Sequence, residues 1–169
     1  TACTWVACEW IAERIRNDRS IKFTHYNIEG NMSGDKKANY QNYIDGRGVG
    51  VVASCYVEGR ILEKAMRVKP RDYLKAWQAG EVGSIQIGMI GSNINFANVI
   101  AGIFTAAGQD IASVHESSSG IFKMREEGDG ILFTAYLPSL VIGTVGGGTG
   151  LPTQRECLEM MGCHGPGKL

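Results

Sequence analysis

The segment Val82–Gln109 contains no charged residue, and this feature most constrains what the chain can fold into. An uncharged segment of this length is typical of a membrane span or of a protein interior. A membrane span is excluded because amide side chains in hydrocarbon would each need a hydrogen-bond partner. These amides are Gln86, Asn93, Asn95, Asn98 and Gln109. We therefore expect a segment buried inside a folded protein, and no membrane segment in this chain.

Small and polar residues recur along this segment at helical spacing. They are Gly91, Asn95, Asn98, Gly102, Thr105 and Gln109. Residues at this spacing share one face of an α-helix. The pattern predicts a long buried central helix whose small and polar stripe lines something polar.

The rest of the chain mixes two hydrophobic periodicities, which predicts an α/β (α+β) fold with the central helix packed against strands. Helical spacing predicts helices over residues 1–16, 60–68, 71–79 and 153–161. Apolar and β-branched runs predict strands over residues 21–28, 49–57, 120–124 and 131–136. A polar, glycine-containing turn at residues 126–130 should join the last two strands into a hairpin.

Composition excludes several classes of partner. Lys plus Arg and Asp plus Glu both total 17, so the formal net charge is zero and neither nucleic acid nor an anionic membrane is expected to bind. The five cysteines form no C-x-x-C pair, which favours reduced thiols in a cytoplasmic protein without a metal site. The chain starts without Met and runs at once into a helical pattern, so we expect it to come from a longer protein.

Two polar, glycine-flanked segments could carry chemistry. Gly146-Gly147-Gly148 follows a predicted strand end, where a backbone without side chains can approach an anion. The alternative is a tight connection, because the spacing matches neither the Rossmann nor the P-loop motif. Asp35-Lys36-Lys37 places an acid beside two ammonium groups that could hold a carboxylate or stabilise an oxyanion. Its alternative is a solvated turn.

Two single residues are also ambiguous. Asn98 could orient a substrate or a buried lysine, or it could be an amide bonded within the core. Asp110 stands where a helix would restart, so its local pattern favours a helix N-cap over a catalytic role.

Taken in order, five motifs resemble those of the 3-hydroxy-3-methylglutaryl-coenzyme A reductases. They are Gly34-Asp35-Lys36-Lys37, Gly46-Arg47-Gly48, Asn93-x-Asn95-x-x-Asn98, Gly108-Gln109-Asp110 and Gly143-Thr144-Val145-Gly146-Gly147-Gly148-Thr149. The resemblance covers residues 30–165. It implies that residues 1–28 end the small NADP-binding subdomain and that residues 29–169 belong to the large substrate-binding domain.

The resemblance also implies a reaction, in which the thioester 3-hydroxy-3-methylglutaryl-coenzyme A is reduced by NADPH, through a hemithioacetal and mevaldehyde, to mevalonate and coenzyme A. Lys36 matches the lysine that stabilises the developing oxyanion, and Asp110 matches the aspartate that tunes it. The remaining matches bind ligands: Asp35, Lys37 and Asn98 match substrate-binding positions, and Val145, Gly146 and Gly147 match the segment beside the dinucleotide. Family members work as homodimers or higher homo-oligomers, so a homo-oligomer is expected.

Other parts of the family pattern are not found in these residues. The family's catalytic glutamate and main dinucleotide motif would precede Thr1, and its thiolate-protonating histidine would follow Leu169. Glu29 stands where animal and plant members have a serine, and the region of Gln78 lacks their lysine, which indicates a bacterial branch. The residues thus predict an incomplete catalytic domain that is inactive by itself. The alternative is a non-catalytic module that retains the fold and binds coenzyme A or a nucleotide.

Overall fold

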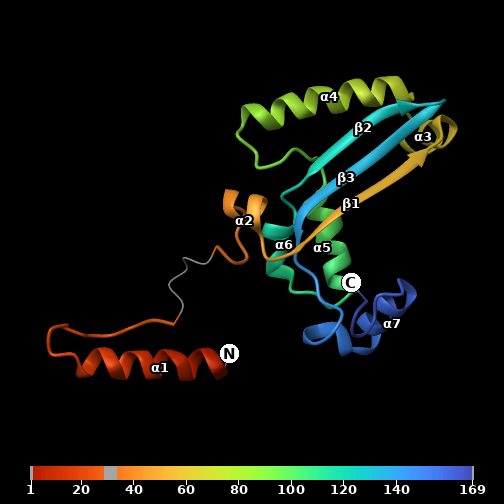
Figure 1. The fold of residues 1–169 in the computed structure, drawn as a ribbon. Coiled ribbons are helices and arrows are strands. Elements are labelled where there is room, and N and C mark those ends of the chain that lie inside the picture. Colours follow the sequence, from red (N-terminus) through yellow and green to blue (C-terminus); the bar gives the residue numbers. More distant parts are fainter. Residues whose placement is uncertain (1, 29–33, 169) are drawn as a thin grey trace. The chain divides into compact units, whose positions relative to one another are not determined.

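The computed structural model describes residues 2–28 and 34–168 of the chain. It contains two compact units, Thr1–Ser33 and Gly34–Leu169. Helices and a β-sheet both occur, so the predicted mixed α and β class is confirmed (Figure 1). Glu29 and the first part of the predicted loop before Lys36 lie outside the described residues.

The first unit consists of helix α1, Ala2–Asn17, followed by an extended segment. The predicted helix is confirmed, but the predicted strand over residues 21–28 is wrong. Its aromatic side chains contact α1 instead: Tyr26 donates a hydrogen bond to Glu9, and the Arg16 guanidinium lies 5.2 Å from the Phe23 ring. An extended segment needs a neighbouring strand for its backbone groups, and alternation of apolar residues alone does not supply one.

The second unit is built on an antiparallel sheet of β1 (Val49–Val57), β2 (Ile121–Glu127) and β3 (Gly130–Leu140) in the order β1-β3-β2. The predicted strand over residues 49–57 and the predicted hairpin are both confirmed, although β3 runs further than expected. The hairpin closes through Gly128 and Asp129, and Gly128 adopts a φ of 58° that favours glycine.

Seven α-helices, with two short 3₁₀ segments, η1 and η2, complete the described residues. In the second unit they are α2 (Tyr40–Asp45), α3 (Gly59–Met66), α4 (Pro70–Gln86), α5 (Phe96–Ala106), η1 (Ile111–Ser113), α6 (Val114–Ser117), η2 (Gly147–Gly150) and α7 (Pro152–Met160). The predicted helices over residues 60–68 and 153–161 are confirmed as α3 and α7. The predicted helix over residues 71–79 is confirmed as part of α4. This helix starts at Pro70, because proline needs no N–H partner in a first turn, and it continues beyond Ala79 along β2 (Figure 1).

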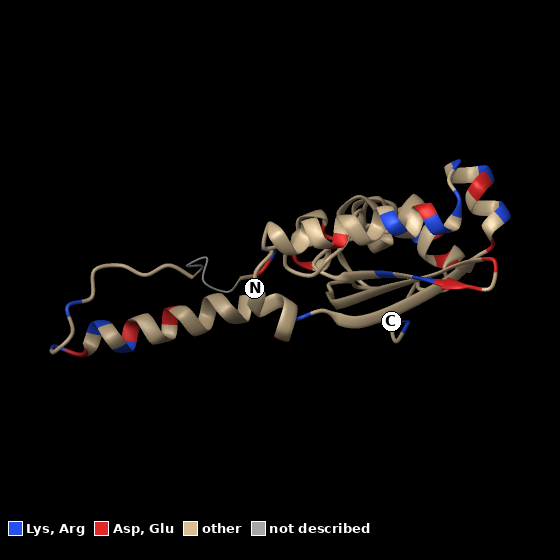
Figure 2. Ribbon diagram, turned by 90° about the horizontal axis from the view of Figure 1, so that it is seen from above, with Lys and Arg blue, Asp and Glu red and all other residues tan. Residues whose placement is uncertain are grey.

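The charge-free segment does not form the predicted long central helix. It is divided between the end of α4 and the eleven residues of α5, because Gly88 and Gly91 adopt φ values of 69° and 81° that end helical geometry. A Cβ on Gly91 would overlap the backbone of Gly120, so this break is also a close backbone contact. Helix α5 contains no charged residue, whereas Figure 2 shows that α1 carries its charged residues in its second half.

The orientation of α5 also differs from the expectation. Its buried side chains are the apolar Ile100 and Phe104, whereas the stripe residues Asn98, Gly102 and Thr105 are exposed. Burial of apolar area therefore decides which face of α5 points inward, because an apolar face gains free energy when it leaves water.

The main hydrophobic core lies where α3 and α4 cover one end of the hairpin. Leu62, Trp77, Met124 and Ile131 are buried together there. Phe122 and Phe133, from the two hairpin strands, stack beside them with ring centroids 5.9 Å apart. This core fixes the sheet, and the sheet in turn positions the loops at its other end. In the described residues, no helix is both long and apolar enough to cross a membrane.

We predict that Leu62→Ala lowers the free energy of unfolding by about 2–5 kcal/mol, because it leaves a cavity in this core. Its neighbour Ile61 is 48% exposed on the same helix, so Ile61→Ala is the matched control and should cost less than about 1 kcal/mol. Urea unfolding followed by circular dichroism measures both. Equal losses would contradict the assignment of the core.

Candidate active site

The loop that carries Lys36 is fixed by its own backbone and by one buried amide. Gly34 and Lys36 adopt φ values of 70° and 58°, and the Lys37 N–H donates to the Gly34 carbonyl at 3.2 Å. The buried Asn42 on α2 donates to the carbonyls of Gly34 and Lys37 at 2.8 and 2.7 Å. The segment is therefore a turn held by these hydrogen bonds, in which Lys36 and Lys37 are exposed, and Lys36 holds a left-handed conformation that is uncommon without glycine.

Lys36 and Asp110 meet, although they are far apart in the sequence. The Lys36 Nζ lies 2.7 Å from the Asp110 Oδ2. The hydrogen bond to Asp110, and then its charge, raise the pKa of Lys36. The hydrogen bond from Lys36 in turn lowers the pKa of Asp110, against a smaller opposing effect of burial. Both groups are therefore held in their charged forms near neutral pH.

The two carboxylate oxygens of Asp110 make different contacts. Its Oδ1 accepts a hydrogen bond from the Ala112 N–H at 3.1 Å, so it is the N-cap of η1. Its Oδ2 faces Lys36. The cap fixes the side chain and leaves the second oxygen directed at the ammonium group.

Two charged residues that the sequence did not assign, Arg47 and Glu116, lie beside Asp35, Lys36 and Asp110, and these five residues form one charged cluster. The Arg47 Nε donates to both carboxylate oxygens of Glu116 at 3.2 Å, and its Nη2 donates to Ser113 at 3.3 Å. Asp35 forms a further ion pair with Arg47. The motif Gly46-Arg47-Gly48 could have indicated that Arg47 lies in a closely packed segment, and in the structure a Cβ on either glycine would overlap β3. No local pattern indicated Glu116.

The other predicted substrate-binding residues lie in more open positions. Lys37 is exposed, and its Nζ donates to the Asp35 carbonyl at 3.0 Å. Asn98 is exposed on the first turn of α5 and donates to the Asn95 side chain at 2.7 Å. Among the described residues, the Asn98 side chain thus bonds to Asn95 and not to Lys36.

The glycine-rich segment packs directly against the segment that carries Asp110. Gly108 has a φ of 66°, and a Cβ placed on it would overlap the backbone of Gly148. Beside this contact, the Gln109 side chain donates to the Gly143 carbonyl at 2.9 Å and accepts from the Gly143 N–H at 2.8 Å. These contacts bring two of the predicted motifs into one site.

A polar cavity of about 280 Å³ lies between these segments. Its wall includes Arg47, Asp110, Val145, Gly146 and Gly147. Gly146 and Gly147 have no side chains, so bare backbone forms part of that wall. The structure thus places the three predicted cofactor-binding residues around the same cavity as Asp110.

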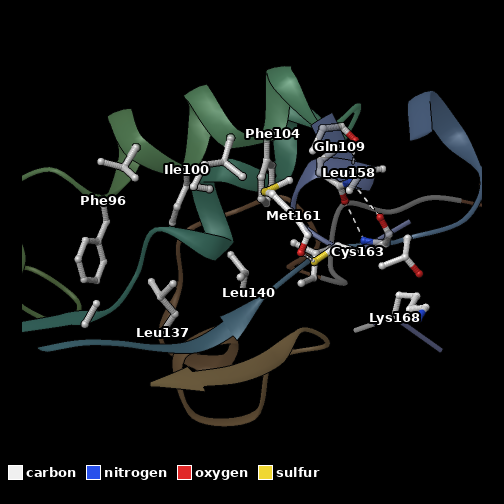
Figure 3. Close-up of a pocket in the computed structure, with 17 residues that line it drawn as sticks. Phe96, Ile100, Phe104, Gln109, Leu137, Leu140, Leu158, Met161, Cys163 and Lys168 are labelled. Carbon is white, nitrogen blue, oxygen red and sulfur yellow. Dashed lines mark hydrogen bonds between the residues drawn. The ribbon is translucent and has the colours of Figure 1, made fainter. Parts of the chain in front are cut away.

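A second cavity, of about 310 Å³, lies between α5, the end of β3 and the region of α7 (Figure 3). Its walls are apolar and include Ile100, Leu140 and Leu158. Gln109 and Gly143 line both cavities, and their paired hydrogen bonds form part of the wall between them. The polar cavity is the candidate site, because it alone of the two adjoins the charged cluster.

Comparison with known proteins gives a consistent result. The family model described as "Hydroxymethylglutaryl-coenzyme A reductase" matches residues 1–169. The chain is 37% identical over 169 residues to a 3-hydroxy-3-methylglutaryl-coenzyme A reductase of Methanocaldococcus jannaschii, which covers 99% of this chain and 42% of the relative. The enzyme of that name from Pyrococcus horikoshii is 44% identical over 146 residues, which are 83% of this chain and 34% of the relative.

A plant relative is somewhat more distant. The 3-hydroxy-3-methylglutaryl-coenzyme A reductase 2 of Arabidopsis thaliana is 35% identical over 140 residues, which are 82% of this chain and 25% of the relative. The chain thus spans less than half the length of each of these relatives. The relatives named here are archaeal and plant, and the bacterial branch stays a prediction.

We predict that Gly108→Ala destabilises the protein by about 1–3 kcal/mol, because it combines a strained φ with overlap of the Gly148 backbone. Gly102→Ala is the matched control. It lies in α5 with open space around it, so it should stabilise the protein by about 0.5–1 kcal/mol. Urea unfolding measures both, and two changes of the same sign would contradict the close backbone contact.

We predict that Lys36→Met raises the pKa of Asp110 toward its ordinary value, because the Lys36 hydrogen bond is the main cause of its lowering. An NMR titration of the Asp110 carboxyl carbon measures this. The wild-type pair stabilises the folded state above the unfolded pKa of Asp110, and this contribution is lost as the pH falls through the lowered folded value. Lys36→Met should therefore make unfolding less dependent on pH in acid.

The control for this titration is Lys37→Met. Lys37 neighbours Lys36 but donates to the Asp35 carbonyl, so its loss should leave the Asp110 pKa unchanged. An equal effect of both variants would show that general loss of positive charge, rather than the specific pair, sets the pKa.

Proposed function

This chain belongs to the hydroxymethylglutaryl-coenzyme A reductase family, and we propose that its protein reduces 3-hydroxy-3-methylglutaryl-coenzyme A to mevalonate and coenzyme A with NADPH. The observation that carries the proposal is the contact of 2.7 Å between Lys36 and Asp110. Asp110 and the glycine-rich segment line the same cavity. A fixed cation, an acidic partner and a backbone-lined space are what a reductase needs to hold a carbonyl beside a dinucleotide.

Lys36 is the residue that would act on the substrate. Reduction of a thioester carbonyl develops negative charge on its oxygen, and a fixed ammonium group stabilises that charge in the transition state. Asp110 raises the pKa of Lys36, so the lysine keeps its proton near neutral pH. This favours an electrostatic role for Lys36, because a group whose pKa lies far above the operating pH transfers its proton poorly.

The substrate-binding roles follow from charge. The exposed ammonium group of Lys37 is available for the carboxylate of the hydroxymethylglutaryl group. Asp35 is paired with Arg47, so we assign it an indirect role in orienting that guanidinium. The exposed amide of Asn98 can bond the substrate from the first turn of α5.

The glycine-rich segment suits a dinucleotide. NADPH would supply the hydride, and Val145, Gly146 and Gly147 would lie beside it. At Gly146 and Gly147 a Cβ would meet nothing within 4 Å, so open backbone faces the space where a ligand would lie. A cavity of about 280 Å³ is small for a whole dinucleotide, so it would accept one end of the cofactor.

We also propose that the protein is a homodimer or higher homo-oligomer in the cytoplasm. This proposal rests on the family, and sedimentation velocity of the purified protein tests the oligomer directly. A monomer at micromolar concentration would contradict it.

The test of the proposed function is an assay of the protein expressed from its complete coding sequence, following NADPH oxidation with 3-hydroxy-3-methylglutaryl-coenzyme A. We expect turnover by the wild type and a loss of at least about 100-fold in kcat for Lys36→Ala. The control is Lys64→Ala, because Lys64 is exposed on α3, away from the cluster. A wild type that binds coenzyme A without turnover would instead support the non-catalytic binding module.

A further inference from the structure

Glu116 is a fully buried carboxylate at the centre of the charged cluster. Its side chain is 0% exposed. It accepts hydrogen bonds from the Lys36 backbone N–H at 3.1 Å and from the Arg47 Nε at 3.2 Å. A buried carboxylate is costly unless it is paired and hydrogen-bonded, so this arrangement strongly constrains both donors.

Glu116 is ionised at neutral pH. Burial is the largest single effect and raises its pKa. The hydrogen bonds from Arg47 and from the Lys36 N–H lower it and together outweigh burial, so the pKa lies below its ordinary value. The guanidinium of Arg47 has a raised pKa because of the same hydrogen bond. The pair is therefore permanently charged over the range in which enzymes usually work.

The position of Glu116 in the chain matters as much as its charge. Asp110 caps η1, and Glu116 lies on α6, which follows η1 directly. One short segment thus contacts Lys36 at two points: Asp110 binds the Nζ, and Glu116 binds the backbone N–H. Lys36 has a φ of 58°, a conformation that is unfavourable outside glycine and persists only where neighbours hold it.

The same carboxylate orients Arg47. The Nε donates to both oxygens of Glu116, and the Nη2 of the same guanidinium pairs with both Glu116 and Asp35. Arg47 lies in the wall of the polar cavity. The Glu116 carboxylate thus binds the backbone of Lys36 and the side chain of Arg47. Glu116 itself does not line that cavity.

We propose that Glu116 is a positioning residue that places the Lys36 ammonium group and the Arg47 guanidinium for catalysis. Its kinetic consequence rests on the proposed function, whereas its structural consequence does not. A glutamine at this position carries no charge and replaces one of the two acceptor oxygens by an amide N–H donor, so it can neither neutralise the Arg47 guanidinium nor accept through both positions as the carboxylate does. An aspartate would keep the charge but withdraw it by one methylene.

The test compares Glu116→Gln and Glu116→Asp with Glu81→Gln. Glu81 is the matched control, because it is a partly buried carboxylate whose ion pair with Lys123 lies on α4 and β2, outside the cluster. The first readout is an NMR titration of the Lys36 side chain in the protein expressed from its complete coding sequence. We expect Glu116→Gln to lower the raised pKa of Lys36 toward its ordinary value, and Glu81→Gln to leave it unchanged.

The second readout is kinetic. We expect Glu116→Gln to lower kcat at least about tenfold, with a smaller change in the KM of the thioester, because a misplaced Lys36 acts mainly on the transition state. Glu116→Asp should fall between Glu116→Gln and the wild type in both readouts. This charged variant also serves the test if Glu116→Gln does not fold.

The outcomes separate the two proposals. A wild type without reductase activity contradicts the proposed function, and the Lys36 titration still decides the role of Glu116. An unchanged Lys36 pKa in both Glu116 variants overturns the positioning role, even if their melting temperatures fall. In an active enzyme, an unchanged kcat in both variants overturns it as well.

Discussion

The burial of one carboxylate organises the candidate site. Glu116 has no exposed side-chain surface, so its charge must be balanced by donors from other parts of the chain. Arg47 and the Lys36 backbone supply them, although both lie far from it in sequence. Because the donors come from separate loops, satisfying one buried anion brings these loops together.

Close backbone contacts extend this arrangement to the glycine-rich segment. Gly108 and Gly148 approach each other at a distance that leaves no room for a Cβ, and Gly48 does the same against the backbone of β3. Each contact would be lost if any other residue stood there. The glycines of the sequence thus have two separate functions here: some allow segments to pack, whereas Gly146 and Gly147 leave open backbone beside the cavity.

The site has a sharp boundary between polar and apolar surroundings. The amide of Gln109 pairs with the backbone of Gly143, and these residues belong to the walls of both cavities. On one side lie Asp110 and Arg47, and on the other lies the apolar face of α5. Within the charged cluster, Glu116 is fully buried, whereas the Lys36 and Asp110 side chains stay partly exposed, so water screens their ion pair more than it screens Glu116.

The sequence by itself determined the elements whose local hydrophobic pattern agrees with their final packing. Helix α1, strand β1 and the hairpin lie where hydrophobic periodicity and turn residues predict them, and the ordered motifs identified the family. Tertiary structure decided the rest. It left residues 21–28 without a neighbouring strand, turned the apolar face of α5 inward, and paired Arg47 with Glu116. The physical reason is that pairing of extended segments, burial of a helix face and neutralisation of a buried charge all depend on residues distant in sequence, which no local pattern records.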